Sequence, residues 1–161
     1  MESVTDRNTH AERGITIFEL LAVVLIITLI AAIAIPVLAH ARDQARRGAV
    51  IADSHGVYKA LLCYNIDKGH FPPTDEFEKA TLAPLTTNGY YDKAASFKEK
   101  LLGEEILVYI GLGEQFLIIL KPKYKPDQVM YIGHTNLLEG DWIDGVYMLV
   151  DGRVVKAEAG S

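Results

Sequence analysis

The longest apolar run of the chain lies close to its first residues. From Leu20 to Leu38 no residue is charged. As a helix this run would rise about 28 Å, close to the roughly 30 Å of a bilayer's hydrocarbon core. The wider segment 15–39 contains one charged residue, Glu19, near its start and one proline, Pro36, near its end. The pattern predicts a helix that can span a membrane.

After the apolar run, the pattern becomes that of an amphipathic helix. Between Ala41 and Lys68 most apolar residues are spaced three or four positions apart, which places them on one helical face. They are Ala45, Val50, Ile51, Val57, Tyr58, Leu61, Leu62 and Tyr64. Gly69 is placed to cap this helix, and the prolines that follow Phe71 end it. We expect the membrane helix to continue as an amphipathic stem.

The rest of the chain reads as a connector followed by strands. The connector, 74–103, is predicted to hold short helices at Phe77 to Leu85 and Ala94 to Leu102, with a turn at Asn88-Gly89. Alternating apolar residues then predict five strands, the last two joined by the Asp151-Gly152 turn. They are Ile106 to Ile110, Gln115 to Lys121, Val129 to Gly133, Gly145 to Val150 and Arg153 to Ala157. The predicted fold class is α+β, with a long N-terminal helix packed on a small antiparallel sheet.

Composition and charge narrow the classes of function. The 161 residues are 50% hydrophobic with a net charge of -5, which argues against disorder and against a nucleic-acid partner. The densest basic cluster, Arg42, Arg46 and Arg47, directly follows the apolar run, so we assign it to lipid headgroups. A single cysteine, Cys63, excludes an intrachain disulfide, and its position predicts a small buried side chain.

Candidate chemistry is confined to one acidic segment. The histidines show no metal-ligand spacing and no nucleophile motif is present, so no catalytic activity and no resident cofactor are predicted. Near the C-terminus Glu139, Asp141 and Asp144 lie close together, with Asp151 one strand away. Oxygen ligands in a flexible loop suit Ca²⁺, although a solvated acidic turn is the alternative. Trp142, within this segment, is predicted to be an anchor or a core residue.

The residues around Glu19 carry a family resemblance. The run from Arg13 to Ile27 resembles the prepilin signal of type IV pilins and type II secretion pseudopilins. In that family a polar leader ends in glycine, a prepilin peptidase cuts after it, the new N-terminal residue is methylated, and a glutamate lies five positions beyond the glycine. Gly14, Ile15 and Glu19 match this spacing, and Pro36 falls where these helices carry a proline.

The resemblance implies an organisation and a set of partners. The chain would comprise a leader (1–14), a membrane and assembly helix (15–39), a helical stem (40–70) and a globular head (71–161). Cleavage after Gly14 would create an amine at Ile15, and the amine of a neighbouring subunit would neutralise Glu19 and set the register of the filament. The implied partners are the prepilin peptidase, other filament subunits, an inner-membrane assembly platform and the lipid bilayer.

The same resemblance implies a location. The protein would be a single-pass protein of a bacterial inner membrane, with its head in the periplasm and later in a periplasmic or surface filament. The basic residues on the two sides of the span do not by themselves favour a cytoplasmic N-terminus, so the orientation rests on the resemblance. The end of the stem, with Tyr64, Asp67, Gly69, Phe71 and Pro72, is similar to that of major pseudopilins, which favours a type II secretion pseudopilus over a type IV pilus.

Two further interpretations belong to other classes. Ala39-His40-Ala41 is typical of a secretory cleavage site, which would release a secreted binding domain starting at Arg42. Alternatively, the apolar helix is a single-pass anchor that never assembles.

Overall fold

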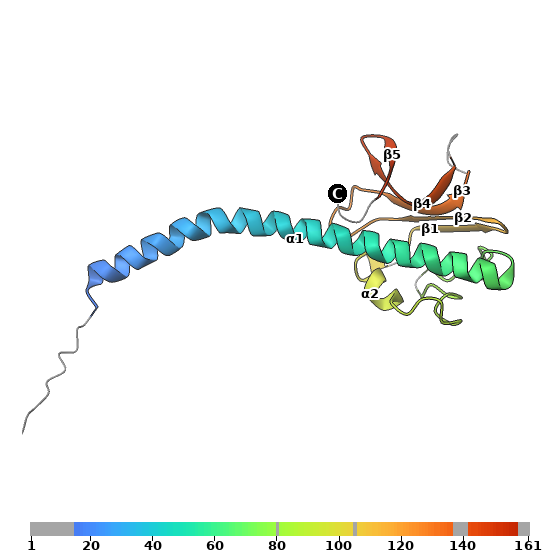
Figure 1. Cartoon of the computed structure of the whole chain (residues 1–161), viewed down its shortest axis with the longest axis horizontal. Coiled ribbons are helices and arrows are strands. Elements are labelled where there is room, and N and C mark those ends of the chain that lie inside the picture. Colours follow the sequence, from blue (N-terminus) through green and yellow to red (C-terminus); the bar gives the residue numbers. More distant parts are fainter. Residues whose placement is uncertain (1–14, 80, 105, 137–141, 158–161) are drawn as a thin grey trace, which may run out of the picture. The chain divides into compact units, whose positions relative to one another are not determined.

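One long helix and a five-stranded sheet make up most of the described chain (Figure 1). The computed structural model describes residues 15–79, 81–104, 106–136 and 142–157. The helical elements are α1 (Ile17–Lys68), α2 (Ala94–Lys98) and the 3-10 turn η1 (Leu102–Glu104). The strands are β1 (Val108–Leu112), β2 (Gln115–Leu120), β3 (Met130–Thr135), β4 (Ile143–Val150) and β5 (Arg153–Lys156). The predicted α+β class is confirmed.

Packing contacts divide the chain between Ala41 and Arg42. Before this boundary the described residues are exposed, apart from Ala31, which is partly covered. After it, α1 has a buried face, formed by Val50, Ile51, Ser54, Val57, Ala60, Leu61 and Tyr64. These positions have the spacing that predicted the amphipathic stem, so the stem is confirmed as part of the second unit.

The sheet is a simple antiparallel meander. Its strand order is β1-β2-β3-β4-β5, so every strand pairs with its neighbour in sequence. Because side chains alternate between the faces of a strand, the register aligns apolar residues in rows across the sheet. Ile118 pairs with Ile132, which pairs with Val146, and Leu120 pairs with Met130, which pairs with Met148. All six residues belong to the hydrophobic core.

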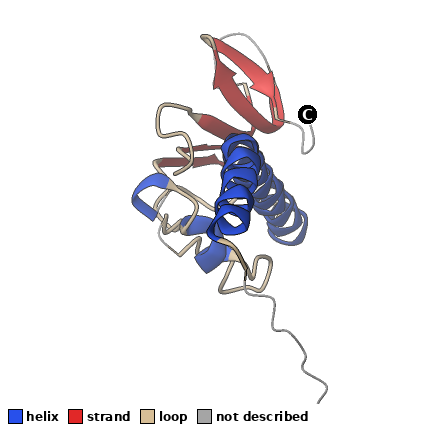
Figure 2. Cartoon of the chain, turned by 90° about the vertical axis from the view of Figure 1, so that its left-hand side faces the viewer, coloured by secondary structure: helices blue, strands red, loops and turns tan. Residues whose placement is uncertain are grey.

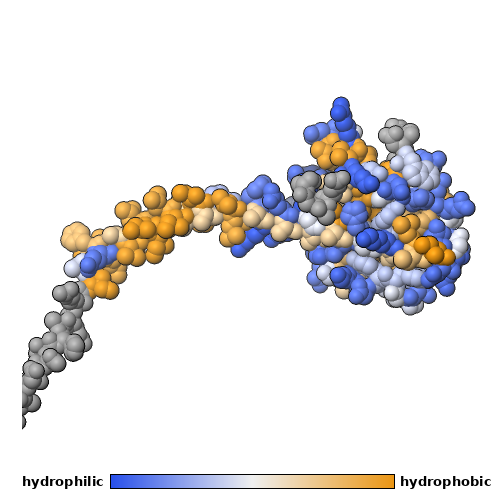
Figure 3. Space-filling model, viewed as in Figure 1, coloured by the Kyte–Doolittle hydropathy of each residue, from blue (hydrophilic) through white to orange (hydrophobic). Residues whose placement is uncertain are grey.

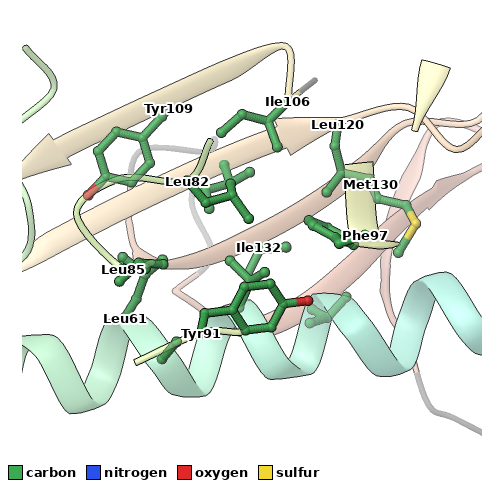
Figure 4. Packing of buried hydrophobic residues seen from close by; sticks show 14 of the residues in the cluster. Leu61, Leu82, Leu85, Tyr91, Phe97, Ile106, Tyr109, Leu120, Met130 and Ile132 are labelled. Carbon is green, nitrogen blue, oxygen red and sulfur yellow. The ribbon is translucent and has the colours of Figure 1, made fainter. Parts of the chain in front are cut away.

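The core joins the stem, the connector and the sheet. Figure 2 shows the helix with the strands on one side and the connector with its short helices on the other. The close-up in Figure 4 shows Leu61 of α1, Leu82 and Phe97 of the connector and Ile132 of β3 contributing side chains to the same packed region. The core of the head thus depends on contributions from all three segments.

A rigid junction connects the end of the stem to the sheet. Gly69 adopts a φ of 79°, and its N–H donates to the carbonyl of Asn65 at 2.8 Å, which is the C-cap that the sequence predicts. Phe71 is buried, and its ring centroid lies 4.6 Å from that of Phe116 in β2. The Tyr109 hydroxyl of β1 donates to the Pro72 carbonyl at 2.7 Å. The residues after the stem are therefore held by the first two strands.

The connector departs from the prediction in its first half. The described residues between Phe77 and Leu85 form no helix, and Glu78 and Ala83 instead form an isolated antiparallel bridge. Leu82 has a φ of 55°, outside the right-handed helical region, and a residue before proline, such as Ala83, also disfavours helix. Phe77, Leu82 and Leu85 nevertheless point into the core, so their spacing reflects burial and not a helix.

Two further predictions in the head are corrected in detail. The helix expected over Ala94 to Leu102 is only α2, because Leu101 instead forms an isolated antiparallel bridge with Pro122, and the separate turn η1 follows. Cys63 is exposed, contrary to the prediction of a buried thiol. On α1 it lies beside the face formed by Ala60 and Tyr64 and lines a cavity of about 300 Å³ with Tyr90 and Tyr91.

Candidate assembly site

The start of α1 is closed by a reciprocal cap between Thr16 and Glu19. The Thr16 backbone N–H and hydroxyl both donate to Glu19 Oε2, at 2.8 and 2.9 Å. The Glu19 N–H lies 3.2 Å from the Thr16 hydroxyl oxygen, which accepts. This is a capping box, in which two otherwise unpaired backbone donors find partners. The glutamate is therefore already held by its own chain.

The sequence contained a signal for Thr16 that our prediction did not use. A threonine followed three positions later by a glutamate, just before an apolar run, is the spacing of a capping box. We predicted Glu19 from its isolation in the apolar segment, and its expected partner was the N-terminus of its own chain, another subunit or interfacial water. The structure identifies Thr16 as an internal partner and fixes the carboxylate at the first turn of α1, four residues after the exposed Ile15. Gly14 lies outside the described residues.

The first part of α1 presents apolar side chains on all of its sides. Large apolar residues from Ile17 to Leu38 are between 49% and 79% exposed. Among the described residues one helix, α1, contains a stretch long and apolar enough to cross a membrane, with a mean hydropathy of 3.1 and no residue of that stretch buried. Figure 3 shows this part of the helix almost uniformly in the hydrophobic colour. Such a surface requires lipid or other apolar helices around it.

Two residues inside this apolar part alter the regular hydrogen bonding of the helix. Pro36 has no N–H, so the carbonyl of Ala32 lacks its usual intrahelical donor, although α1 continues through this position. The Thr28 hydroxyl donates to the Leu25 carbonyl at 2.8 Å, which satisfies that polar group inside an apolar surface. Of these two residues, Pro36 was a predicted assembly residue and Thr28 was not. The structure places Pro36 one helical turn before His40.

In the head, Asp144 is the centre of a small polar cluster. Its carboxylate accepts hydrogen bonds from the Tyr58 hydroxyl of α1 and from His134 Nδ1 of β3, the latter at 2.8 Å. The His134 hydrogen bond, then that of Tyr58, hold the pKa of Asp144 below its usual value. Trp142 packs edge-on against His134, with ring centroids 5.0 Å apart, and is 51% exposed, so it is not a core residue.

The four residues of the calcium prediction are not all brought together. Asp144 is the second residue of β4 and Asp151 follows its last residue, so they are separated by about 20 Å along the strand. A single ion therefore cannot be bound by both carboxylates. Glu139 and Asp141 lie outside the described residues, and within the described ranges no group of three ligating side chains occurs. Calcium binding by Glu139, Asp141 and Asp144 stays a prediction.

Tyr58→Phe should lower the free energy of unfolding by about 1 kcal/mol near neutral pH, since the hydrogen bond to a half-exposed carboxylate is lost. Because the pKa of Asp144 is lowered on folding, its stabilising effect exists above the unfolded pKa and is lost as the pH falls through the folded value. The cost of Tyr58→Phe should thus shrink below about pH 4.

Urea unfolding of the full chain in detergent micelles measures this effect, with the single tryptophan, Trp142, as the fluorescent reporter. Tyr131→Phe, in a half-buried tyrosine of β3, is the matched control and should show no such pH dependence. An equal cost of Tyr58→Phe in acid and at neutral pH would contradict the role of the Asp144 carboxylate.

Comparison with known proteins gives three related matches. The chain is 31% identical over 97 residues to the type II secretion system core protein G of Escherichia coli (strain K12), a match covering 57% of this chain and 66% of that protein. It is 30% identical over 67 residues to the protein of the same name from Klebsiella michiganensis, covering 42% and 47%. The corresponding protein of Pectobacterium carotovorum subsp. carotovorum is 27% identical over 77 residues, covering 48% and 49%.

These matches have a limited extent. Each spans less than two thirds of the length of the curated relative. No family model matches the chain, and no solved structure matches it significantly. The matches nevertheless agree with one another, with the exposed apolar helix that carries Glu19 and with the antiparallel head. The chain belongs to the pilin and pseudopilin family.

Proposed function

We propose that this protein is a structural subunit of a type II secretion pseudopilus. The observation that carries the proposal is the apolar part of α1, which is exposed on all sides and interrupted by one capped glutamate. In a membrane, lipid covers this surface, and in a filament the same surface packs against helices of other subunits. The names of the three curated relatives favour type II secretion over a type IV pilus. The role of the chain is assembly and not catalysis.

The proposed maturation rests on the resemblance of Gly14, Ile15 and Glu19 to the prepilin signal. The prepilin peptidase cuts after Gly14 and the new amine at Ile15 is methylated. This amine would lie one residue before Thr16, whose N–H donates to the carboxylate of Glu19 at 2.8 Å. The subunit is anchored in a bacterial inner membrane with its head on the periplasmic side, where the assembly platform and other subunits extract it into the filament.

N-terminal sequencing and mass spectrometry of the protein from the membrane fraction test this proposal. We expect a first residue of methylated Ile15. A start at Arg42 would instead identify a secreted domain, and retention of the residues before Ile15 would identify a plain anchor. The matched control is Gly14→Val, which removes the small residue at the cleavage point and should leave the leader in place.

A further inference from the structure

Basic residues follow the apolar part of α1 within one to two helical turns. Arg42 is the third residue after Ala39, and Arg46 and Arg47 follow on the same helix. Seven residues of helix rise about 10 Å, slightly more than the roughly 5–8 Å of the headgroup region on one side of a bilayer, and long arginine side chains can reach back over that difference. Figure 3 shows the hydrophobic colour giving way to hydrophilic residues along this part of α1. The arginines therefore follow the span at the depth where lipid phosphates occur.

Basic residues from other segments of the head line a cavity together with one of these arginines. A cavity of about 400 Å³ lies between α1 and the loop that follows β2. Arg46, Lys100 and Lys123 are its cationic lining, Glu99 its anionic lining, and Val50 and Tyr124 contribute apolar surface. The Lys123 N–H donates to the Lys100 carbonyl at 2.8 Å, which joins the two segments that carry these lysines. A backbone hydrogen bond thus holds together the two segments that carry Lys100 and Lys123.

The basic residues in and near this cavity differ in how far an acidic side chain balances their charge. Lys100 pairs with Asp53, so its charge is largely balanced within the head. Arg46 is 3.6 Å from Asp43, and because both side chains are 67% exposed, this pair contributes little. Arg47 Nε is buried without a protein acceptor among the described residues. Burial raises the pKa of Tyr124, and the charge of Arg47 opposes that rise.

We propose that this cavity, defined by Arg46, Lys100, Lys123 and Tyr124, binds the phosphate headgroup of an anionic phospholipid in the leaflet from which α1 emerges. Guanidinium and ammonium groups are the usual phosphate ligands, and the half-buried ring of Tyr124 suits the glycerol region beside the phosphate. The inference rests on the proposed membrane insertion. It would hold the head of an unassembled subunit against the membrane until extraction.

The test uses the full chain in a neutral detergent, titrated with phosphatidylglycerol or phosphatidylcholine, with bound lipid counted by native mass spectrometry. We expect the wild-type chain to retain phosphatidylglycerol about tenfold more tightly. Because each basic residue near a lipid surface contributes about 1 kcal/mol, Arg46→Gln and Lys123→Gln should each weaken that binding about fivefold, and the double variant should lose the preference. Phosphatidylcholine binding should not change.

Matched controls separate this pocket from general charge. Lys59→Gln/Lys93→Gln removes two charges at the separate cavity that Cys63 lines and should keep the preference. Arg46→Glu is not a control but a second test variant. It reverses one charge of the pocket at an exposed position and so leaves the core intact. Equal retention of both lipids by the wild type, a preference that survives in the double variant, or equal loss in the control would each overturn the proposal.

Two further outcomes also decide the matter. Displacement of phosphatidylglycerol by millimolar inorganic phosphate would identify a free-anion site and overturn the lipid assignment. Membrane insertion is measured separately by carbonate extraction of cell membranes, and N-terminal sequencing identifies the first residue of the protein. A variant that keeps methylated Ile15 and resists extraction but loses lipid preference supports the pocket, whereas failure of insertion in the wild type would overturn the proposed function itself.

Discussion

Replacing Glu19 with Ala is expected to reduce filament assembly at least tenfold while leaving membrane insertion and cleavage intact. The apolar part of α1 has no other charged side chain, so Glu19 is the group whose burial between helices most needs a partner. An alanine removes that need and makes insertion easier. It also removes the polar feature that distinguishes one register of an otherwise apolar helix from the next. Sheared filaments, quantified against the total membrane-bound subunit, give the measurement.

The capping box makes a sharper version of this experiment possible. Glu19→Gln keeps an oxygen that can accept from Thr16 but removes the charge, whereas Thr16→Val keeps the charge and removes the hydroxyl of the cap. If the charge sets the register, Glu19→Gln should assemble as poorly as Glu19→Ala, and Thr16→Val should assemble better than either. Normal assembly of Glu19→Gln would show that the carboxylate acts only as a helix cap.

Local patterns predicted the regular elements of this protein well. The five strands were recovered within two or three residues, since alternating apolar residues and the Asp151-Gly152 turn act over short distances. The stem was recovered because its buried positions recur at helical spacing, and its end because Gly69 needs a positive φ. In each case the residues that determine the element lie within a few positions of it in the sequence.

The failures arose where burial and backbone shape come from distant segments. Phe77, Leu82 and Leu85 have helical spacing, but they are buried by the stem and sheet while Leu82 adopts a left-handed conformation. The cluster around Asp144 combines residues of α1, β3 and β4, so no sequence motif signals Tyr58 or His134 as partners. Asp151 was expected one strand away from Asp144, and β4 does separate them by its full length, so the calcium prediction remains for Glu139, Asp141 and Asp144 alone.

The junction between stem and sheet gives the largest expected effect on folding, at Gly111 of β1. A Cβ at this position would lie 2.0 Å from the Pro72 carbonyl oxygen and 2.9 Å from the Tyr109 hydroxyl. The carbonyl cannot move away freely, because it accepts the Tyr109 hydrogen bond and follows Phe71, whose N–H donates to the Gly113 carbonyl at 2.7 Å. Gly111→Ala should therefore displace the buried Phe71 and cost about 3 kcal/mol or more.

Thermal unfolding of the full chain in detergent micelles, followed by Trp142 fluorescence, measures this cost. Gly48→Ala is the matched control, since a Cβ there meets nothing within 4 Å and alanine is the better helix former, so this variant should be unchanged or more stable by up to about 1 kcal/mol. A Gly111→Ala variant as stable as Gly48→Ala would mean that the Pro72 segment moves without loss. In that case the junction would be a loose linker, and it would not transmit the position of the stem to the sheet.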